Sequence, residues 1–359
     1  MFSIEGFYQD LELYGINNII NNNSINNIIN NNNSNDIQKL GMKDSLILAG
    51  NIHKKVRSII KKHYQPNLSL NNLADLIEST TKNLTKNNGI NYGIGFPSGL
   101  SLNEVAAHYS PHYYEPGIND YYFKTKDTLK IDFGVEVNGW IIDSAFTITF
   151  NPEYLNLLTA VQEATYTGIK NCGIDVRIKE WSKDIEEVMT SYEVNDKQVV
   201  PIETLGGHNI KRKIIHGGVF LPAKYLNYYP TDLKFEEGLY AIETFGSLGS
   251  GITVEKGENS LYAINPTFNQ KIKDTKLFKF HKKLLKRFET LPFSSRYLLN
   301  DIYNLKDYNK KDLDILVEKK VLKQYPPLVD TKNGMTAQYE HTILLTENSK
   351  INLSKGDDY

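Results

Sequence analysis

Five residues along this chain have side chains that together could hold two metal ions. Four are carboxylates and one is an imidazole: Asp132, Asp143, His208, Glu243 and Glu340. Such an oxygen-rich set is suited to binding Mn²⁺, Fe²⁺, Co²⁺ or Zn²⁺ and is unlike a thiolate-type zinc site. Two such ions close together can share one water molecule and lower its pKa, which produces a nucleophile at neutral pH. The residues therefore point to metal-assisted hydrolysis.

The two aspartates lie in the best hairpin pattern of the chain, over residues 128–150. Asn138-Gly139 at its centre is the preferred two-residue type I′ turn. With this turn, Asp132 and Asp143 become diagonal neighbours on one face, at most about 7–8 Å apart between backbone positions. A loop with an odd number of residues would place them on opposite faces, so the shared face depends on the turn.

Each candidate ligand, taken alone, also has a structural explanation. The two aspartates could accept hydrogen bonds from backbone amides or an arginine, and for this pair alone the metal and structural explanations weigh equally. Glu243 in LYAIETFG and Glu340 in AQYEHTILL could each form half of a buried ion pair, because a lone buried carboxylate is costly. His208, after two glycines, is by itself more often structural than a ligand. The presence of all five favours the metal site.

Two further histidines, His108 and His216, are not assigned to metal. Near a dinuclear centre, neutral histidines can hydrogen-bond a tetrahedral intermediate or a substrate amine. His112 and His281 have less support, and His341 would point away from Glu340 if that segment is a strand. His108 and His216 are therefore the candidates for contact with the substrate.

Composition narrows the class of protein. The 41 Lys and Arg nearly balance the 42 Asp and Glu, so overall charge does not draw the 359-residue chain to nucleic acid or membrane. The single cysteine, Cys172, excludes an internal disulfide and fits a reducing compartment. No run of apolar residues is long enough to span a membrane, and the first residues do not resemble a secretory signal. We expect a soluble, globular, cytoplasmic protein.

The chain divides into three stretches by composition. Residues 1–36 are predicted to be disordered because the Asn-rich tract at 17–36 can bury little apolar surface. A low-complexity insertion without a specific role is the favoured explanation of this tract, and a prion-like interaction segment is the alternative. Residues 37–359 are expected to form the catalytic domain, with helices over 44–63, 70–84, 152–171 and 178–191, strands over 199–253 and 335–345, and short strands and loops over 93–111.

Within this domain, residues 265–325 are lysine-rich and mostly helical, and they are expected to form an inserted, winged-helix-like subdomain. Its basic face could contact RNA or a ribosome. A solvated charged face is the favoured explanation.

The ordered motifs from about Leu46 to Tyr359 resemble the type-2 methionine aminopeptidases of eukaryotes and archaea. The matching strings include FPSGLSLNEVAAHYSP, LKIDFGVEVNGWIIDSAFTITFNP, GGHNI, IIHGG, AIETFGS, TLPFSSRYL, AQYEHTILL and GDDY. The resemblance implies an α+β pita-bread fold, which that family shares with prolidases and creatinase. The helical insertion before Glu340 is the mark of type 2 rather than type 1.

The resemblance also implies roles for individual residues. It implies two divalent ions (Co, Mn, Fe or Zn) held by Asp132, Asp143, His208, Glu243 and Glu340. Catalysis is expected from His108, Glu243 and His216, with Glu243 as proton shuttle for a metal-bridging water that attacks the scissile carbonyl. Substrate is expected to contact His108, His216, Phe96, Ile215 and Tyr325, the last three forming the methionine side-chain pocket.

The expected activity is removal of the initiator methionine from nascent proteins with a small second residue. The expected partners are the N-termini of nascent polypeptides, and the protein is expected to be a monomer that binds neither membrane nor DNA. Ribosome association stays open because the Asn tract replaces the charged N-terminal blocks of eukaryotic members.

One string of the expected pocket departs from the family. Where members often have CSHY, this chain has NSLY with Leu261, which removes a polar group. An Xaa-Pro peptidase on the same fold and a non-catalytic relative that binds RNA or ribosomes are the two alternatives.

Overall fold

The computed structural model describes residues 37–86, 91–112, 120–299 and 303–359, so the predicted disordered segment 1–36 lies outside the described residues. The longer helices are α4 (Met42–Ile60), α5 (Leu70–Leu84), α6 (Leu155–Asn171), α7 (Ile178–Thr190), α8 (Thr275–Phe288) and α9 (Lys310–Glu318), with 3-10 turns η2 (Lys61–His63), η3 (Pro152–Tyr154) and η4 (Ser295–Leu298). The four helices expected before residue 200 are confirmed to within a few residues.

The strands include β1 (Leu68–Ser69), β2 (Tyr92–Leu102), β3 (Val105–Ala107), β4 (Tyr122–Phe123), β5 (Thr128–Val137), β6 (Trp140–Thr149), β7 (Glu193–Val194), β8 (Lys197–Gln198), β9 (Val200–Pro201) and β10 (Gly206–Ile210). They continue with β11 (Phe220–Pro222), β12 (Gly238–Ser247), β13 (Thr253–Glu255), β14 (Leu261–Ile264), β15 (Phe293–Ser294), β16 (Leu322–Gln324), β17 (Leu328–Asp330), β18 (Thr336–Thr346) and β19 (Ser349–Asn352). The segment expected to contain short strands instead begins with the long strand β2, whose pairing with β5 is interrupted twice.

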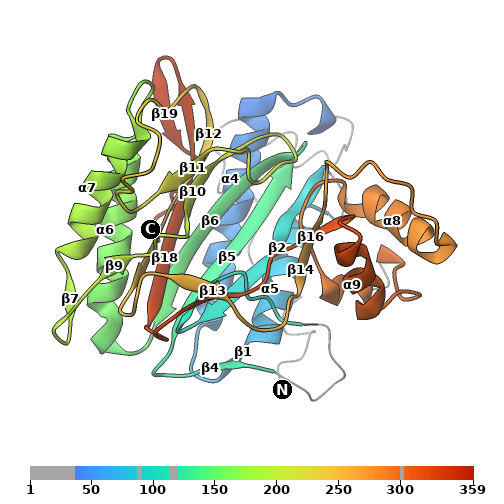
Figure 1. Cartoon of the computed structure of the whole chain (residues 1–359), viewed down its shortest axis with the longest axis horizontal. Helices are drawn as coiled ribbons and strands as arrows, with labels where there is room; N and C mark the ends of the chain where they lie inside the picture. Colours follow the sequence, from blue (N-terminus) through green and yellow to red (C-terminus); the bar gives the residue numbers. More distant parts are fainter. Residues whose placement is uncertain (1–36, 87–90, 113–119, 300–302) are drawn as a thin grey trace.

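Two antiparallel sheets form the centre of the molecule. One has the order β2-β5-β6, and the other has the order β11-β10-β12-β18-β19, with β9 also paired to β12. β6 and β18 run side by side where the two sheets meet (Figure 1). Helices α4 and α5 pack on the first sheet, while α6 packs on β12 and β18 and is covered in turn by α7. Alternating apolar residues let each sheet bury one face under its helices.

The junction of β6 and β18 is made by side chains rather than by a regular ladder. Ser144 Oγ donates to the Glu340 carbonyl at 2.8 Å, and Thr147 Oγ1 donates to the Gln338 carbonyl at 2.8 Å. The Asp143 amide donates to Thr342 Oγ1 at 2.8 Å. Three hydroxyls thus join the backbones of two sheets that are assembled from opposite halves of the sequence.

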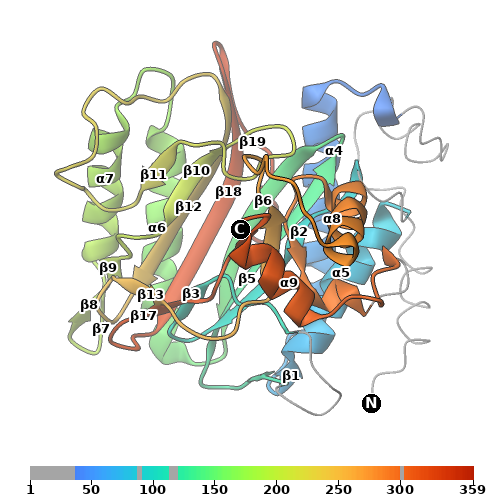
Figure 2. The ribbon, with the colours of Figure 1, turned by 45° about the vertical axis from the view of Figure 1, so that its right-hand side comes forward.

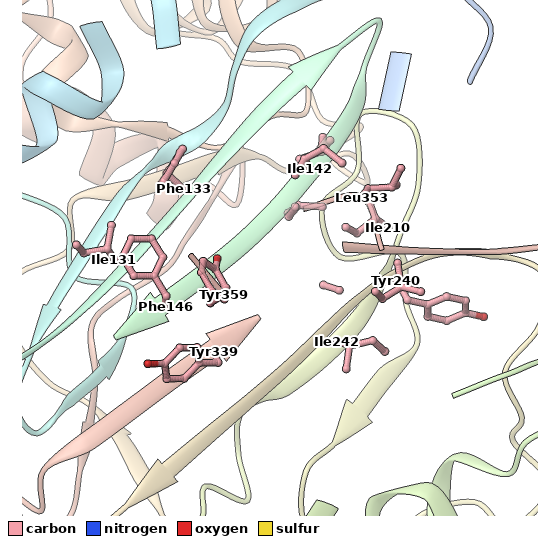
Figure 3. Packing of buried hydrophobic residues seen from close by; sticks show 14 of the residues in the cluster. Ile131, Phe133, Ile142, Phe146, Ile210, Tyr240, Ile242, Tyr339, Leu353 and Tyr359 are labelled. Carbon is pink, nitrogen blue, oxygen red and sulfur yellow. The ribbon is translucent and has the colours of Figure 1, made fainter. Parts of the chain in front are cut away.

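An aromatic side chain closes the core behind this junction. Tyr359 packs against Phe146 of β6 and Tyr339 of β18, with ring centroids 5.2 and 5.9 Å away (Figure 3). Its hydroxyl is 2.6 Å from Ser144 Oγ. Arg57 of α4 lies over its ring and pairs with Asp358. The segment at 353–359 therefore fastens α4 to both sheets.

The β5–β6 hairpin has the predicted turn. Asn138 and Gly139 have φ angles of 53° and 80°, as a type I′ turn requires. Asp132 pairs with Ala145 and Gly134 pairs with Asp143, which confirms that both aspartates share a face.

The lysine-rich segment contains α8 and α9 and lies at the edge of the molecule on the side of β2 (Figure 2). Together with the small sheet β15-β14-β16, these helices enclose a hydrophobic cluster separate from that of the central sheets. Asp274 caps α8, Asn309 and Asp312 form a capping box on α9, and Lys276 joins the helices through Asp312 at 2.8 Å. That this segment is a subdomain of winged-helix type stays a prediction.

Across the described parts of the chain, none of the helices combines the length and the apolar character needed to cross a membrane.

Candidate metal centre and substrate cavity

The five predicted ligands converge from five strands of the two sheets. Glu243 on β12 and Glu340 on β18 are directly paired, and His208 on β10 pairs with Ala241, two positions before Glu243 on the same face. Asp132 and Asp143 reach the same place from the hairpin. His208 Nε2 is 3.5 Å from Asp143 Oδ2, which joins the two sheets at the site.

The ligand atoms form two overlapping groups. Asp143, His208 and Glu340 form one, and Asp132, Glu243 and Glu340 form the other. Within each group the ligand atoms lie within 4.8 Å of one another. Because Glu340 belongs to both, the arrangement has the form of two neighbouring cation sites with a shared carboxylate.

Unpartnered acceptor atoms test whether these residues fit metal ions. Within the described residues, Asp132 Oδ1 and both carboxylate oxygens of Glu340 are buried without a hydrogen-bond partner. Leaving a buried charged acceptor unsatisfied costs more than the 1–3 kcal/mol typical of a neutral group. Hard divalent cations prefer oxygen ligands of this kind, so the donor set fits metal.

The electrostatics of the cluster agree with this fit. Burial raises the pKa of Asp132, Glu243 and Glu340 well above the usual carboxyl range, and the neighbouring carboxylates raise it further. Like charges held this close favour protonation unless a cation lies between them. A metal ligand must be deprotonated, so ion binding would release these protons.

Gln338 is a site residue that the sequence reasoning missed. Its Nε2 donates to Asp132 Oδ2 at 3.2 Å and to Glu243 Oε1 at 2.6 Å, which bridges the two sheets. It precedes Glu340 by two positions on β18, so period-two alternation places both side chains on one face. That alternation was the available signal.

A cavity of about 390 Å³ opens onto the centre. Its wall includes four of the proposed ligands, Glu340 being the exception, and all the residues expected to contact substrate: Phe96, His108, Ile215, His216 and Tyr325. Leu261 also lines it. The structure thus brings every predicted site residue to one place, while their individual roles stay predictions.

Phe96 reaches the cavity because of an irregularity in β2. The pairing of β2 with β5 shifts on both sides of Phe96, which lies opposite Gly134. A Cβ atom at Gly134 would come within 2.3 Å of the Phe96 ring. The ring therefore occupies the space that a side chain at position 134 would fill.

The two cavity histidines are neutral near pH 7. Burial lowers the pKa of His108 to about 4. His216 lines the cavity and its side chain is exposed to solvent there, yet desolvation by the surrounding protein, together with His208 and His108, holds its pKa well below the usual value. The His216 ring is 4.4 Å from that of His208, and Tyr325 contacts the rings of His108 and His216.

His108 also has an unusual backbone, with φ of 68°. This left-handed conformation is uncommon outside glycine and persists only where surrounding contacts hold it. Nothing in the sequence pattern signalled it.

Solved structures with the same architecture include "a thermophilic Arx1", with a TM-score of 0.73 and 18% identity, covering 91% of this chain and 93% of that one. A methionine aminopeptidase from Thermotoga maritima has a TM-score of 0.57 at 18% identity, covering 90% and 98%. A prolidase from Pyrococcus furiosus has a TM-score of 0.51 at 14% identity, covering 88% and 64%. At these identities the likeness concerns the fold, which is the expected α+β pita-bread fold.

Sequence relatives are much closer. The model of metallopeptidase family M24 matches residues 41–347. Methionine aminopeptidase 2 of Komagataella phaffii is 46% identical over 317 residues, covering 86% of this chain and 68% of that protein. Methionine aminopeptidase 2 of Saccharomyces cerevisiae (strain YJM789) is 42% identical over 337 residues, covering 90% and 78%. The chain therefore belongs to metallopeptidase family M24, and within it to the type-2 methionine aminopeptidases, which are metal-dependent hydrolases.

Proposed function

We propose that this protein removes the initiator methionine from nascent polypeptides whose second residue is small, using two divalent ions (Co, Mn, Fe or Zn). The observation that carries the proposal is the pair of overlapping ligand groups sharing Glu340 at the wall of the cavity. The substrates are N-termini of newly made chains, which places the reaction in the cytoplasm. We further propose that the protein acts as a monomer.

The ions would be held by Asp132, Asp143, His208, Glu243 and Glu340. When bound, they supply Lewis acidity, which lowers the pKa of water and polarises the scissile carbonyl. Glu243 takes a proton from the water that attacks the carbonyl carbon. The C–N bond then breaks, and Glu243 delivers the proton to the leaving amine. Gln338 supports this by holding Glu243 Oε1 at 2.6 Å, which fixes the carboxylate for transfer in both directions.

His108 and His216 act on the substrate rather than on the ions. Desolvation keeps the pKa of both rings low, aided at His216 by the neighbouring histidines, so both are uncharged at neutral pH and do not repel a cationic centre. A neutral imidazole can donate one hydrogen bond to the developing oxyanion or accept one from the substrate amine. Tyr325, in ring contact with both, limits how far they can turn.

The methionine side chain would occupy the apolar part of the cavity, beside Phe96, Ile215 and Tyr325. A flexible thioether suits such a wall because it packs well against aromatic edges. Leu261 makes this wall more apolar than a histidine would. The pocket therefore selects by shape and apolar contact.

The decisive experiment measures hydrolysis of Met-Ala-Ser by metal-stripped protein titrated with Mn²⁺ or Co²⁺. Methionine release should return with metal. In Asp143→Asn, which keeps the side-chain shape, it should fall by about a hundredfold or more, since even changes to groups that orient metal ligands cost 10–100-fold. Asp175→Asn, at an exposed ion pair with Lys234, is the matched control and should behave as wild type.

Two outcomes would change the proposal. Faster cleavage of Xaa-Pro peptides than of Met-Ala-Ser would indicate a prolidase-type enzyme on the same fold. A folded, metal-loaded protein that releases no methionine would support the non-catalytic alternative.

A further inference from the structure

Residues 211–219, between β10 and β11, form the loop that carries Ile215 and His216 into the cavity; we call it the His216 loop. Its second half is closed by Asn209, the residue after the proposed ligand His208. The Gly217 amide donates to the Asn209 carbonyl at 2.7 Å, and the Val219 amide donates to Asn209 Oδ1 at 2.8 Å. One side of His216 is therefore anchored to the strand that brings His208.

The first half of the loop is anchored to the β5–β6 hairpin turn. The Lys213 amide donates to the Gly139 carbonyl at 2.6 Å, and Arg212 Nε donates to the Asn138 carbonyl at 2.8 Å. The Gly139 amide in turn donates to buried Glu136 Oε2 at 2.8 Å. The turn that sets the register of the two aspartates therefore also supports the His216 loop.

Lys213 also ties the loop to the end of α8 in the lysine-rich segment. Its ammonium pairs with Glu289 Oε2 at 2.6 Å, and Thr290 Oγ1 donates to its carbonyl. Lys213 and Glu289 both have a positive backbone φ, 61° and 49° respectively. Conformations of this kind cost about 1–3 kcal/mol each and persist where the surrounding contacts fix them.

We propose that Lys213 is a positioning residue for His216. The inference rests on the proposed function, in which His216 contacts the substrate. The amide, carbonyl and ammonium of Lys213 are each bound to a different group, so the loop cannot shift without breaking contacts to the hairpin or to the end of α8. The Lys213 and Glu289 side chains are 24% and 41% exposed, and a pair this accessible adds little to overall stability. Its effect should therefore fall on the geometry of the loop.

Lys213→Met removes the ammonium and keeps the aliphatic stem. With Met-Ala-Ser and saturating Mn²⁺, we expect kcat to fall about tenfold with KM little changed, because misplacing a reacting group by a fraction of an ångström has effects of this size. Lys213→Arg should recover most of the loss, and Glu289→Gln should reproduce it. Lys276→Met, which breaks the pair of Lys276 with Asp312 inside the helical segment, is the control for loss of an ion pair of α8 and should keep wild-type kcat.

A double mutant separates positioning from general damage. In a His216→Ala background, Lys213→Met should lower kcat by less than about twofold, because the group that it positions is already absent. An equal fall in both backgrounds, or an unchanged kcat in Lys213→Met, would overturn the proposal.

A second measurement does not need turnover. In protein with ¹³C-labelled histidine, the His216 ring resonances should move in Lys213→Met and stay in place in Lys276→Met. If wild type releases no methionine, the proposed function fails, and this spectrum still decides whether Lys213 holds the ring. Unmoved His216 resonances would overturn the positioning role.

Discussion

Glu340 is the residue on which both ligand groups depend, and both its oxygens are buried without a partner among the described residues. Glu340→Gln keeps the shape of the side chain and removes its charge. Without metal, this variant should be more stable than wild type by about 1 kcal/mol or more, the value of one pKa unit, because repulsion in the cluster is relieved. With Mn²⁺ the order should reverse.

Thermal unfolding with and without Mn²⁺ checks this prediction, and exposed Glu163→Gln is the control. A metal-free Glu340→Gln protein that melts below metal-free wild type would argue that the cluster is satisfied without cations.

His53 shows a different kind of buried polar group. Arg57 Nη1 donates to its Nδ1 at 3.3 Å, so Nε2 carries the proton and donates to the Phe133 carbonyl at 2.9 Å. Burial and Arg57 hold the pKa of His53 well below the usual value. A second proton would have to be placed against the guanidinium, so the folded state keeps this ring neutral.

This arrangement predicts a pH dependence of stability. Below about pH 6.5 the unfolded chain binds a proton at His53 that the folded state does not. The free energy of unfolding therefore decreases as the pH is lowered, by up to about 1.4 kcal/mol per pH unit. The loss continues down to the depressed pKa. In His53→Gln this contribution is absent. The difference in free energy of unfolding by which wild type exceeds the variant should therefore shrink as the pH is lowered from 8 to 5. Urea unfolding of both proteins across that range measures it, and a constant difference would contradict it.

At the scale of elements, the approach of β2 to β5 decides the shape of the cavity. Besides the irregular pairing of β2, the position of Phe96 in the cavity wall requires the room that Gly134 leaves for its ring. Gly134→Ala should displace the ring and raise KM for methionine substrates about tenfold, the value of roughly 1.4 kcal/mol of lost apolar contact, while Mn²⁺ affinity stays near wild type. Gly173→Ala, where the added Cβ meets nothing closer than 3.7 Å, is the control for steady-state kinetics. An unchanged KM would mean that Phe96 does not contact the substrate.

At the scale of the whole molecule, the proposed ions lie across the junction of the two sheets. Asp132 and Asp143 belong to one sheet, and the remaining ligands belong to the other. Removing the ions leaves acidic groups facing each other where side-chain hydroxyls join β6 to β18. The cluster around α8 and α9 contains none of the five ligands.

Metal removal should therefore loosen the molecule unevenly. Amide hydrogen exchange should become faster in β6 and β18 after chelation and stay unchanged in α8. Adding Mn²⁺ at a hundred times its dissociation constant should restore about 2.7 kcal/mol of stability. Uniformly faster exchange, α8 included, would contradict this division.

Local rules made much of the framework predictable. The helices over 70–84 and 178–190 follow from apolar spacing, and the Asn138-Gly139 turn determines the hairpin register because turn geometry involves only neighbouring residues. Local reasoning misplaced the start of the helix predicted over 44–63, because α4 begins at Met42 with Gly41 as its N-cap. The five ligands were proposed from residue type and the family resemblance then implied their roles, since no local rule relates Asp132 to Glu340.

By itself, then, the sequence determined most of the helices, the hairpin of β5 and β6, the common face of the two aspartates and the residue types suited to metal. Only the tertiary structure decided that Gln338 bridges two carboxylates, that His108 takes a left-handed backbone and that Lys213 links the His216 loop to α8. Each of these depends on contacts between segments far apart in the chain. Their geometry follows from how the two sheets and the helical segment pack, which local pattern does not encode.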